Sequence, residues 1–275
     1  MNNEIFKRVT AAESVFLDLP YIFEINGQPF SKQDLQNWQL KEYKKTAKLL
    51  GKLFASKLKI TNDMPFVEIK AAVVAEKIRL GQDTLKDALH RQTRLANAGS
   101  KFGVRASFGR RKVSVADIYI DHSAVHAKEA MATFSKMMTI NSPENQFYNF
   151  KANPNHFYSS GSDTDQTVVE MTGGTRIANK FTLLYGNEEG LVTKYDPNFK
   201  YQTAGSGQLD DGFVIGGVRH QMTDEGDRLH ARLQVEFPAI LPNAIIHAHA
   251  VHLLVEFSNW LTDITMLLDE AHSSK

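Results

Sequence analysis

Two sets of histidine and glutamate residues recur at a spacing that would place each set on one face of a helix. Imidazole and carboxylate groups suit zinc, iron and manganese as ligands. Two such helices side by side can build a metal site between them. The candidate ligands are His122, His126 and Glu129 in the first set, and His249, His252 and Glu256 in the second.

The same spacing is also typical of ordinary, partly buried polar helix faces, so spacing alone is weak support for a metal. The zinc-protease motif needs glutamate directly after its first histidine, but Ser123 follows His122. A metal-dependent enzyme is therefore the alternative interpretation. The leading interpretation assigns no catalytic residue and expects no cofactor.

Several chemistries are excluded by residues or motifs that the sequence lacks. There is no cysteine, which excludes disulfides, thiolate zinc sites, iron–sulfur clusters and cysteine nucleophiles. No glycine-rich loop ends in Lys followed by Ser or Thr, and no Gly-x-Ser-x-Gly elbow occurs. The motifs thus favour no enzyme class, and a non-enzymatic role is preferred.

A long segment without acidic residues favours a polyanionic partner. From Ala88 to Ala116 the chain has no Asp or Glu, and glycines, basic residues and two phenylalanines alternate. Arginine matches phosphate oxygens with paired donors, and aromatic faces can stack on unpaired bases. Lysines at helical spacing precede this segment and would attract phosphates without sequence preference. The candidate nucleic-acid-binding residues are Arg91, Arg94, Lys101, Phe102, Arg105, Phe108, Arg110, Arg111 and Lys112, with Lys41, Lys45, Lys48 and Lys52.

A plainer interpretation of these residues stays open. A lysine stripe on an amphipathic helix is often only its solvated face, and Phe102 and Phe108 would suit the core side of a strand pair. The sequence has no motif of a known nucleic-acid-binding family. Binding of DNA or RNA is therefore predicted from charge alone.

The charge is divided unequally along the chain. The formal net charge is +1, yet residues 1–113 carry a net +10 and residues 114–275 a net −9. We expect a basic helical and strand portion over 1–113 and an acidic α+β portion with a C-terminal helix over 114–275, or one compact domain. Opposite charges could join unlike halves of neighbouring subunits, which predicts a homo-oligomer.

The pattern of elements predicts an α+β fold, with a mixed or antiparallel sheet and several long amphipathic helices. A capping sequence at Ser31 begins one helix, and Gly81 divides a second helical region. The expected elements are strands within 14–25, helices from 31 and over 65–97, two strands over 101–120, a helix over 122–138, polar loops over 141–167 and 200–212, short strands at 168–169, 181–185 and 191–194, a hairpin of 213–222 with 228–237, and a helix over 243–271.

The chain shows no apolar leader in its first 16 residues and no run of 18 apolar residues. We therefore expect a cytoplasmic location and no membrane partner. The leading hypothesis is a non-enzymatic nucleic-acid-binding protein that self-associates. The alternatives are the metal-dependent enzyme and a structural assembly protein without a nucleic-acid role.

Overall fold

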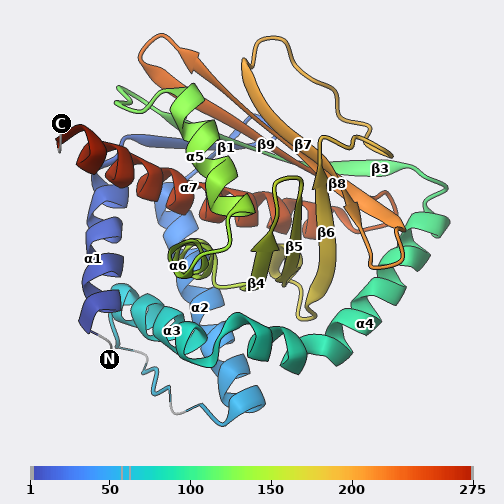
Figure 1. The fold of residues 1–275 in the computed structure, drawn as a ribbon, viewed down its shortest axis with the longest axis horizontal. Coiled ribbons are helices and arrows are strands. Elements are labelled where there is room, and N and C mark those ends of the chain that lie inside the picture. The colour runs from blue at the N-terminus through green and yellow to red at the C-terminus, as the bar shows by residue number, and fades with distance from the viewer. Residues whose placement is uncertain (1–2, 57, 62, 274–275) are drawn as a thin grey trace.

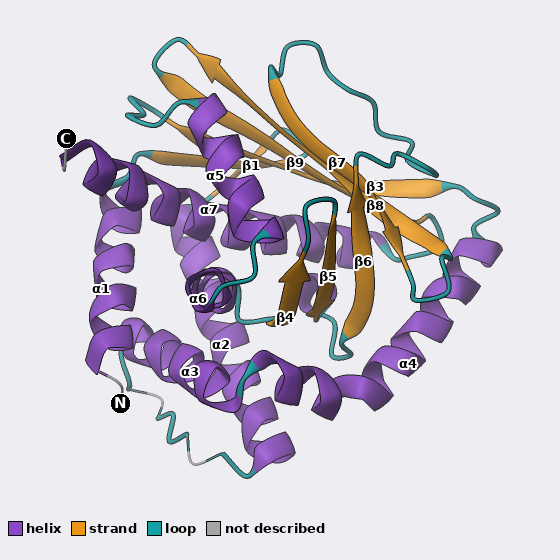
Figure 2. Cartoon of the chain, in the orientation of Figure 1, coloured by secondary structure: helices purple, strands orange, loops and turns teal. Residues whose placement is uncertain are grey.

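The computed structural model describes residues 3–56, 58–61 and 63–273 as seven α-helices, one short 3-10 helix and a nine-stranded antiparallel sheet (Figures 1 and 2). This confirms the predicted α+β class. The helices are α1 (Asn3–Asp18), α2 (Lys32–Phe54), α3 (Phe66–Leu80), α4 (Gln82–Ala106), α5 (Ala127–Thr139), α6 (Pro143–Ala152), η1 (Thr172–Gly174) and α7 (Asn243–Ser273). The strands are β1 (Tyr21–Ile25), β2 (Gln28–Phe30), β3 (Arg111–Ile120), β4 (His156–Gly161), β5 (Asp165–Glu170), β6 (Asn179–Tyr185), β7 (Tyr201–Gln208), β8 (Val214–Glu225) and β9 (Arg228–Pro238).

The sheet bends around the long C-terminal helix α7 (Figure 1). Its strand order is β2-β1-β3-β9-β8-β7-β6-β5-β4, and every neighbouring pair is antiparallel. Every residue of α7 from His249 to Thr265 is buried. A helix that is buried on all sides is a core element rather than a surface one. Polar side chains on α7 are therefore enclosed, and each needs a partner.

The remaining helices close the space that the sheet leaves open. α1, α2, α3 and α6 pack together at one end, and α1, α2 and α6 also contact α7. α4 extends from this group along β4, β6, β8 and β9 (Figure 2). A hollow between the sheet, α4 and α7 results, and the candidate site lies there.

Two predicted helix signals are confirmed by local geometry. The Ser31 hydroxyl accepts a hydrogen bond from the Asp34 amide at 3.0 Å, as an N-cap residue should. Gly81 has φ of 78° and separates α3 from α4. The hairpin of β8 and β9 and the C-terminal helix are also confirmed.

The prediction of strands beginning at Ser14 was wrong, because α1 continues to Asp18 and only β1 follows Pro20. Ile5, Val9 and Phe16 lie on the buried face of α1. Their helical spacing outweighs the strand preference of the aromatic and branched residues near them.

The prediction of two strands over 101–120 was also wrong in its first half, because α4 extends through Ala106 and only β3 is a strand. The helix expected from His122 begins at Ala127. The two long polar segments contain α6, β4 and β7, and residues 191–194 form no strand. The secondary structure of these segments depends on pairing with distant strands, which a polar local sequence does not reveal.

The charge boundary at residue 113 falls inside β3, whose neighbours are β1 and β9. Both charge portions thus contribute strands to the same sheet, and their buried residues form one hydrophobic cluster. Within the described residues, no helix is long and apolar enough to cross a membrane.

Candidate metal centre and pocket

Four buried side chains bring two imidazoles and two carboxylates together inside the sheet: His156, Glu170, His252 and Glu256. One potential ligand atom from each residue lies within 4.8 Å of the others. Glu256 Oε2 is 2.9 Å from His156 Nε2 and 3.3 Å from His252 Nε2. Glu170 Oε2 lies 3.8 and 3.9 Å from the same two nitrogens.

The four histidine–glutamate separations lie near the edge length of a coordination tetrahedron, although the whole set spans up to 4.8 Å and would have to contract around an ion. Ligand atoms bound to zinc at about 2.0–2.2 Å lie about 3.3–3.6 Å from one another in that geometry. The four measured separations, from 2.9 to 3.9 Å, bracket this range. Two neutral imidazoles and two carboxylates also carry a charge of −2, which a divalent cation balances.

The fold supplies the four side chains from three elements. His156 begins β4 and Glu170 ends β5, the strand paired with it, so the two residues lie opposite each other in the register. His252 and Glu256 are four residues apart on α7 and share one face. Because the sheet bends around α7, the strand ends meet this face.

The hydrogen bond of His156 fixes which ring nitrogen can bind a cation. Its Nδ1 lies 3.1 Å from the Asn149 carbonyl oxygen, which can only accept, so Nδ1 carries the hydrogen. Nε2 faces Glu256 Oε2 at 2.9 Å, so it either donates to the carboxylate from a protonated ring or offers its lone pair to a cation bound between the two groups. An outer hydrogen bond of this type is the usual way in which proteins orient a metal-binding histidine.

His252 and Glu256 influence each other strongly. Burial disfavours the charged His252, but the nearby Glu256 and Glu170 carboxylates outweigh burial and raise its pKa. Burial would raise the pKa of Glu256, but His252 and His156 outweigh it and lower the pKa. Neither ring nitrogen of His252 has a hydrogen-bond partner among the described residues. Both pKa shifts therefore favour an ionised Glu256 with a positive charge next to it.

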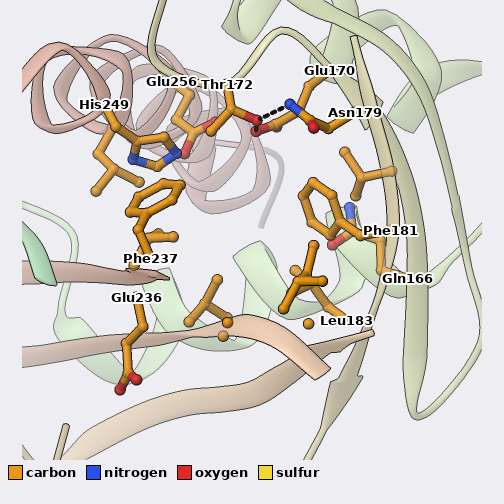
Figure 3. A pocket seen from close by; sticks show the side chains of 18 of the residues that line it. Gln166, Glu170, Thr172, Asn179, Phe181, Leu183, Glu236, Phe237, His249 and Glu256 are labelled. Atoms are coloured by element: carbon orange, nitrogen blue, oxygen red, sulfur yellow. Dashed lines mark hydrogen bonds between the residues drawn. The ribbon is translucent and has the colours of Figure 1, made fainter. Parts of the chain in front are cut away.

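Glu170 is held by a short chain of hydrogen bonds, drawn as dashed lines in Figure 3. The Thr172 hydroxyl donates to Glu170 Oε1 at 3.2 Å and accepts from the Asn179 amide at 3.2 Å. Glu170 Oε2 is left facing the two histidines. Gly173, with φ of 58°, brings this turn against α7, where an added Cβ would lie 2.9 Å from the His249 amide nitrogen.

A buried lysine stabilises the start of β4. The ammonium of Lys77 donates to the carbonyl oxygens of Pro154 at 2.7 Å and His156 at 2.6 Å. Burial lowers the pKa of Lys77 well below its usual value. Lys77 thus ties α3 to the backbone of His156.

A cavity of about 390 Å³ adjoins the four residues, and its lining includes His156, Glu170 and Glu256. Figure 3 shows Phe181 and Phe237 facing each other across this pocket, with Glu256 and His249 at one end. Its volume lies in the range of small-molecule sites, which are mostly apolar with a few polar groups. A cation held by the four side chains would be open to this cavity.

Two further histidines belong to the pocket wall. Burial lowers the pKa of His220 to about 4. Burial, aided by the neighbouring His252, lowers the pKa of His249 well below its usual value. The His249 ring stacks on His252 with 5.2 Å between ring centroids. Both wall histidines are therefore neutral at neutral pH and can donate or accept hydrogen bonds.

The two predicted histidine sets have different places in the structure. His252 and Glu256 belong to the four-residue cluster, and His249 lies beside it in the pocket wall. The expectation that the other set shares a helix face was wrong, because His122 is in a turn and His126 precedes α5, which holds Glu129. His122 and His126 are exposed and pair with Asp227 and Asp224.

Sequence reasoning missed His156, which lies in a segment interpreted as a polar loop, and Glu170, which directly follows the short strand expected at 168–169. The sequence carried one usable signal, since His252 and Glu256 lie four residues apart on a strongly apolar helix. Buried polar residues on such a helix need partners. The partners come from strands whose position depends on the sheet, so local spacing does not reveal them.

The predicted nucleic-acid-binding residues are divided between solvent and internal contacts. Phe102, Phe108, Arg91, Arg94, Arg105 and Arg110 are exposed. Lys101 forms an ion pair with Asp211, while Arg111 and Lys112 donate to the carbonyl oxygens of Ile215 and Leu241. Lys41, Lys45, Lys48 and Lys52 lie on α2, which packs against α3, α7 and β1, whereas the arginines lie on and after α4.

No protein-family model matches this chain, and no curated protein matches its sequence.

Proposed function

We propose that the protein is a metal-dependent enzyme that acts on an apolar small molecule. His156, Glu170, His252 and Glu256 would hold one divalent transition-metal ion, zinc before iron or manganese, since the ligand set is half nitrogen and half oxygen. The observation that carries the proposal is the convergence of these four buried ligand atoms beside a cavity.

The surroundings support a reactive site more than a purely structural one. Four protein ligands fill a tetrahedral site, so a reactive ion here needs a fifth position, and the cavity that three of the four candidate ligands border offers space for one. A bound zinc ion polarises a carbonyl group or lowers the pKa of a water molecule. The apolar walls and the neutral His220 and His249 would hold an apolar substrate that turns a polar group toward the ion.

Metal content of the purified protein tests this proposal. After reconstitution with zinc and removal of excess ions, we expect about one equivalent per chain, as one set of four ligands implies. His252→Ala and Glu170→Gln should each lose most of this metal, because each removes one ligand. Circular dichroism of each variant would check that it remains folded.

His126→Ala is the matched control, because this histidine is exposed and pairs only weakly with Asp224 at 3.7 Å. It should keep the full metal content. Equal metal in all variants, or none in the reconstituted wild type, would overturn the proposal. With cobalt in place of zinc, addition of acetohydroxamate should change the visible spectrum if the ion is open to the pocket, and an unchanged spectrum would contradict a catalytic role.

Binding of nucleic acid by the exposed arginines stays a prediction. The exposed Phe102 and Phe108 beside arginines support a second candidate function in which these rings stack on unpaired bases. The expected basic hairpin is replaced by the end of α4, so these groups lie along a helix and the turn after it.

A further inference from the structure

The largest exposed apolar side chains near the pocket gather on α4 and the turns beside its C-terminal end. Phe108 is 85% exposed, Phe102 68%, Leu95 65% and Ile240 52%. Single exposed apolar residues are common, but a group of them marks a contact surface. We call these four residues the α4 apolar surface.

The geometry of α4 places these side chains together. Leu95 and Phe102 are seven residues apart, so they project from the same side of the helix two turns apart. Ile240 borders the next turn, since its amide donates to the Ser107 hydroxyl at 3.0 Å and its side chain lies beside Gly103. Phe108 adopts φ of 52°, a strained value for a bulky residue, and projects into solvent.

Basic residues surround this surface. Arg91 and Arg94 precede Leu95, while Arg105 and Arg110 flank Phe108, and all four are exposed. The chain has no acidic residue between Ala88 and Ala116. Asp211, which reaches this region from the β7–β8 connection, is paired with Lys101. Exposed apolar side chains among arginines are typical of helices that lie in the interface of an anionic membrane.

A neighbouring face of α4 borders the pocket. Ala96, Gly99, Ser100 and Gly103 of this helix line the cavity. α4, a helix of 25 residues, thus presents small residues to the pocket and large apolar residues to solvent. A surface that contacts lipid would bring the pocket rim close to the layer in which apolar molecules collect.

We propose that the α4 apolar surface docks on anionic membranes and that the pocket receives its apolar substrate from there. This contact lies on the membrane surface and involves no spanning helix, and it revises the sequence-based expectation of no membrane partner. The choice of substrate rests on the proposed function, whereas docking itself requires no metal. A membrane explains both the exposed apolar residues and the arginines, whereas a nucleic acid offers no apolar phase for Leu95 and Ile240.

Co-sedimentation with lipid vesicles tests the proposal on the full chain. The protein should bind vesicles of phosphatidylcholine mixed with phosphatidylglycerol and bind pure phosphatidylcholine vesicles much less. Phe102→Ser with Phe108→Ser should weaken binding about tenfold or more, because two inserted rings are lost. Arg91→Gln with Arg94→Gln should also weaken it, and added salt should reduce binding of the wild type.

Leu17→Ser is the matched control, since Leu17 is an exposed apolar residue on α1 and lies outside the α4 apolar surface. It should bind vesicles as the wild type does. Glu170→Gln should also bind normally, which separates failure of the metal proposal from failure of docking. Absence of vesicle binding, or equal binding by the phenylalanine variant, overturns the inference. Tight binding of a single-stranded RNA oligonucleotide without vesicle binding overturns it in favour of the nucleic-acid interpretation.

Discussion

Among single residues, the buried histidines of the pocket show how the interior controls protonation. His220 contacts Phe257 and Phe134 through its ring, and its Nδ1 has no hydrogen-bond partner among the described residues. Burial lowers its pKa to about 4, although the Glu256 carboxylate acts in the opposite direction. The imidazole therefore stays neutral in the folded chain over a pH range in which it is protonated in the unfolded chain.

The sign of the resulting pH dependence follows from linkage. Between pH 6.5 and about 4 the unfolded state binds a proton at His220 that the folded state does not bind. The stability from the neutral ring is fully present above pH 6.5 and is lost as the pH falls through this window. The loss from this residue is on the order of 3 kcal/mol.

We predict that His220→Gln flattens the dependence of unfolding free energy on pH between 6.5 and 4. Urea unfolding of the metal-free protein, with a chelator present, measures this slope. His122→Gln is the control, since His122 is exposed and pairs with Asp227. If His220→Gln shows the same slope as the wild type, His220 does not titrate abnormally.

Among the elements, the short helix η1 links two parts of the candidate site. It follows β5, which carries Glu170, and packs against α7, which carries His252. Gly173 makes this contact possible, because its φ of 58° suits glycine and its Cα lies against the His249 backbone. Glu170 comes directly before this turn, and the hydroxyl of Thr172, the first residue of η1, donates to its carboxylate. The close approach therefore fixes the position of a candidate ligand.

We predict that Gly173→Ala destabilises the fold by about 1–3 kcal/mol or more and weakens metal binding, since both the backbone conformation and the contact with α7 resist a Cβ. Gly27→Ala is the matched control. Its φ of 72° imposes similar backbone strain, but nothing lies within 4 Å of the added Cβ. Thermal melts and metal content of both variants measure the difference, and equal effects would show that packing against α7 is unimportant.

Elements differ in how well the sequence predicts them, and the reason is the range of the interactions that form them. The helix from Ser31 and the β8–β9 hairpin depend on caps, turns and spacing within a few residues, so they are predicted well. β4 and α4 beyond Asn97 depend on pairing and packing with distant segments. The half of the candidate site on α7 was accordingly visible as His252 and Glu256, while the half on β4 and β5 was not.

At the scale of the whole molecule, ion pairs already join the basic and acidic portions of the chain. Lys101 pairs with Asp211 and Arg8 with Glu144. Such exposed pairs are weak and sensitive to salt. These pairs neutralise some of the opposite charges within one chain, and the remaining charges are available for contacts between subunits.

We predict self-association that weakens as salt rises, because the +10 and −9 portions attract each other between neighbouring chains. Light scattering over a salt series measures this. Association that grows with salt would indicate an apolar contact instead. A monomer at every salt concentration would show that the charges are balanced within one chain.

We propose above that His156, Glu170, His252 and Glu256 bind one metal ion between them. Anomalous diffraction at the zinc absorption edge, from crystals of the zinc-reconstituted protein, locates the ion directly. We expect one strong peak at about 2.0–2.2 Å from the Nε2 atoms of both histidines and from an oxygen of each carboxylate. A crystal without a peak at this position, or with its strongest peak at the exposed His122 and Asp227, would show that these four residues do not form the metal site.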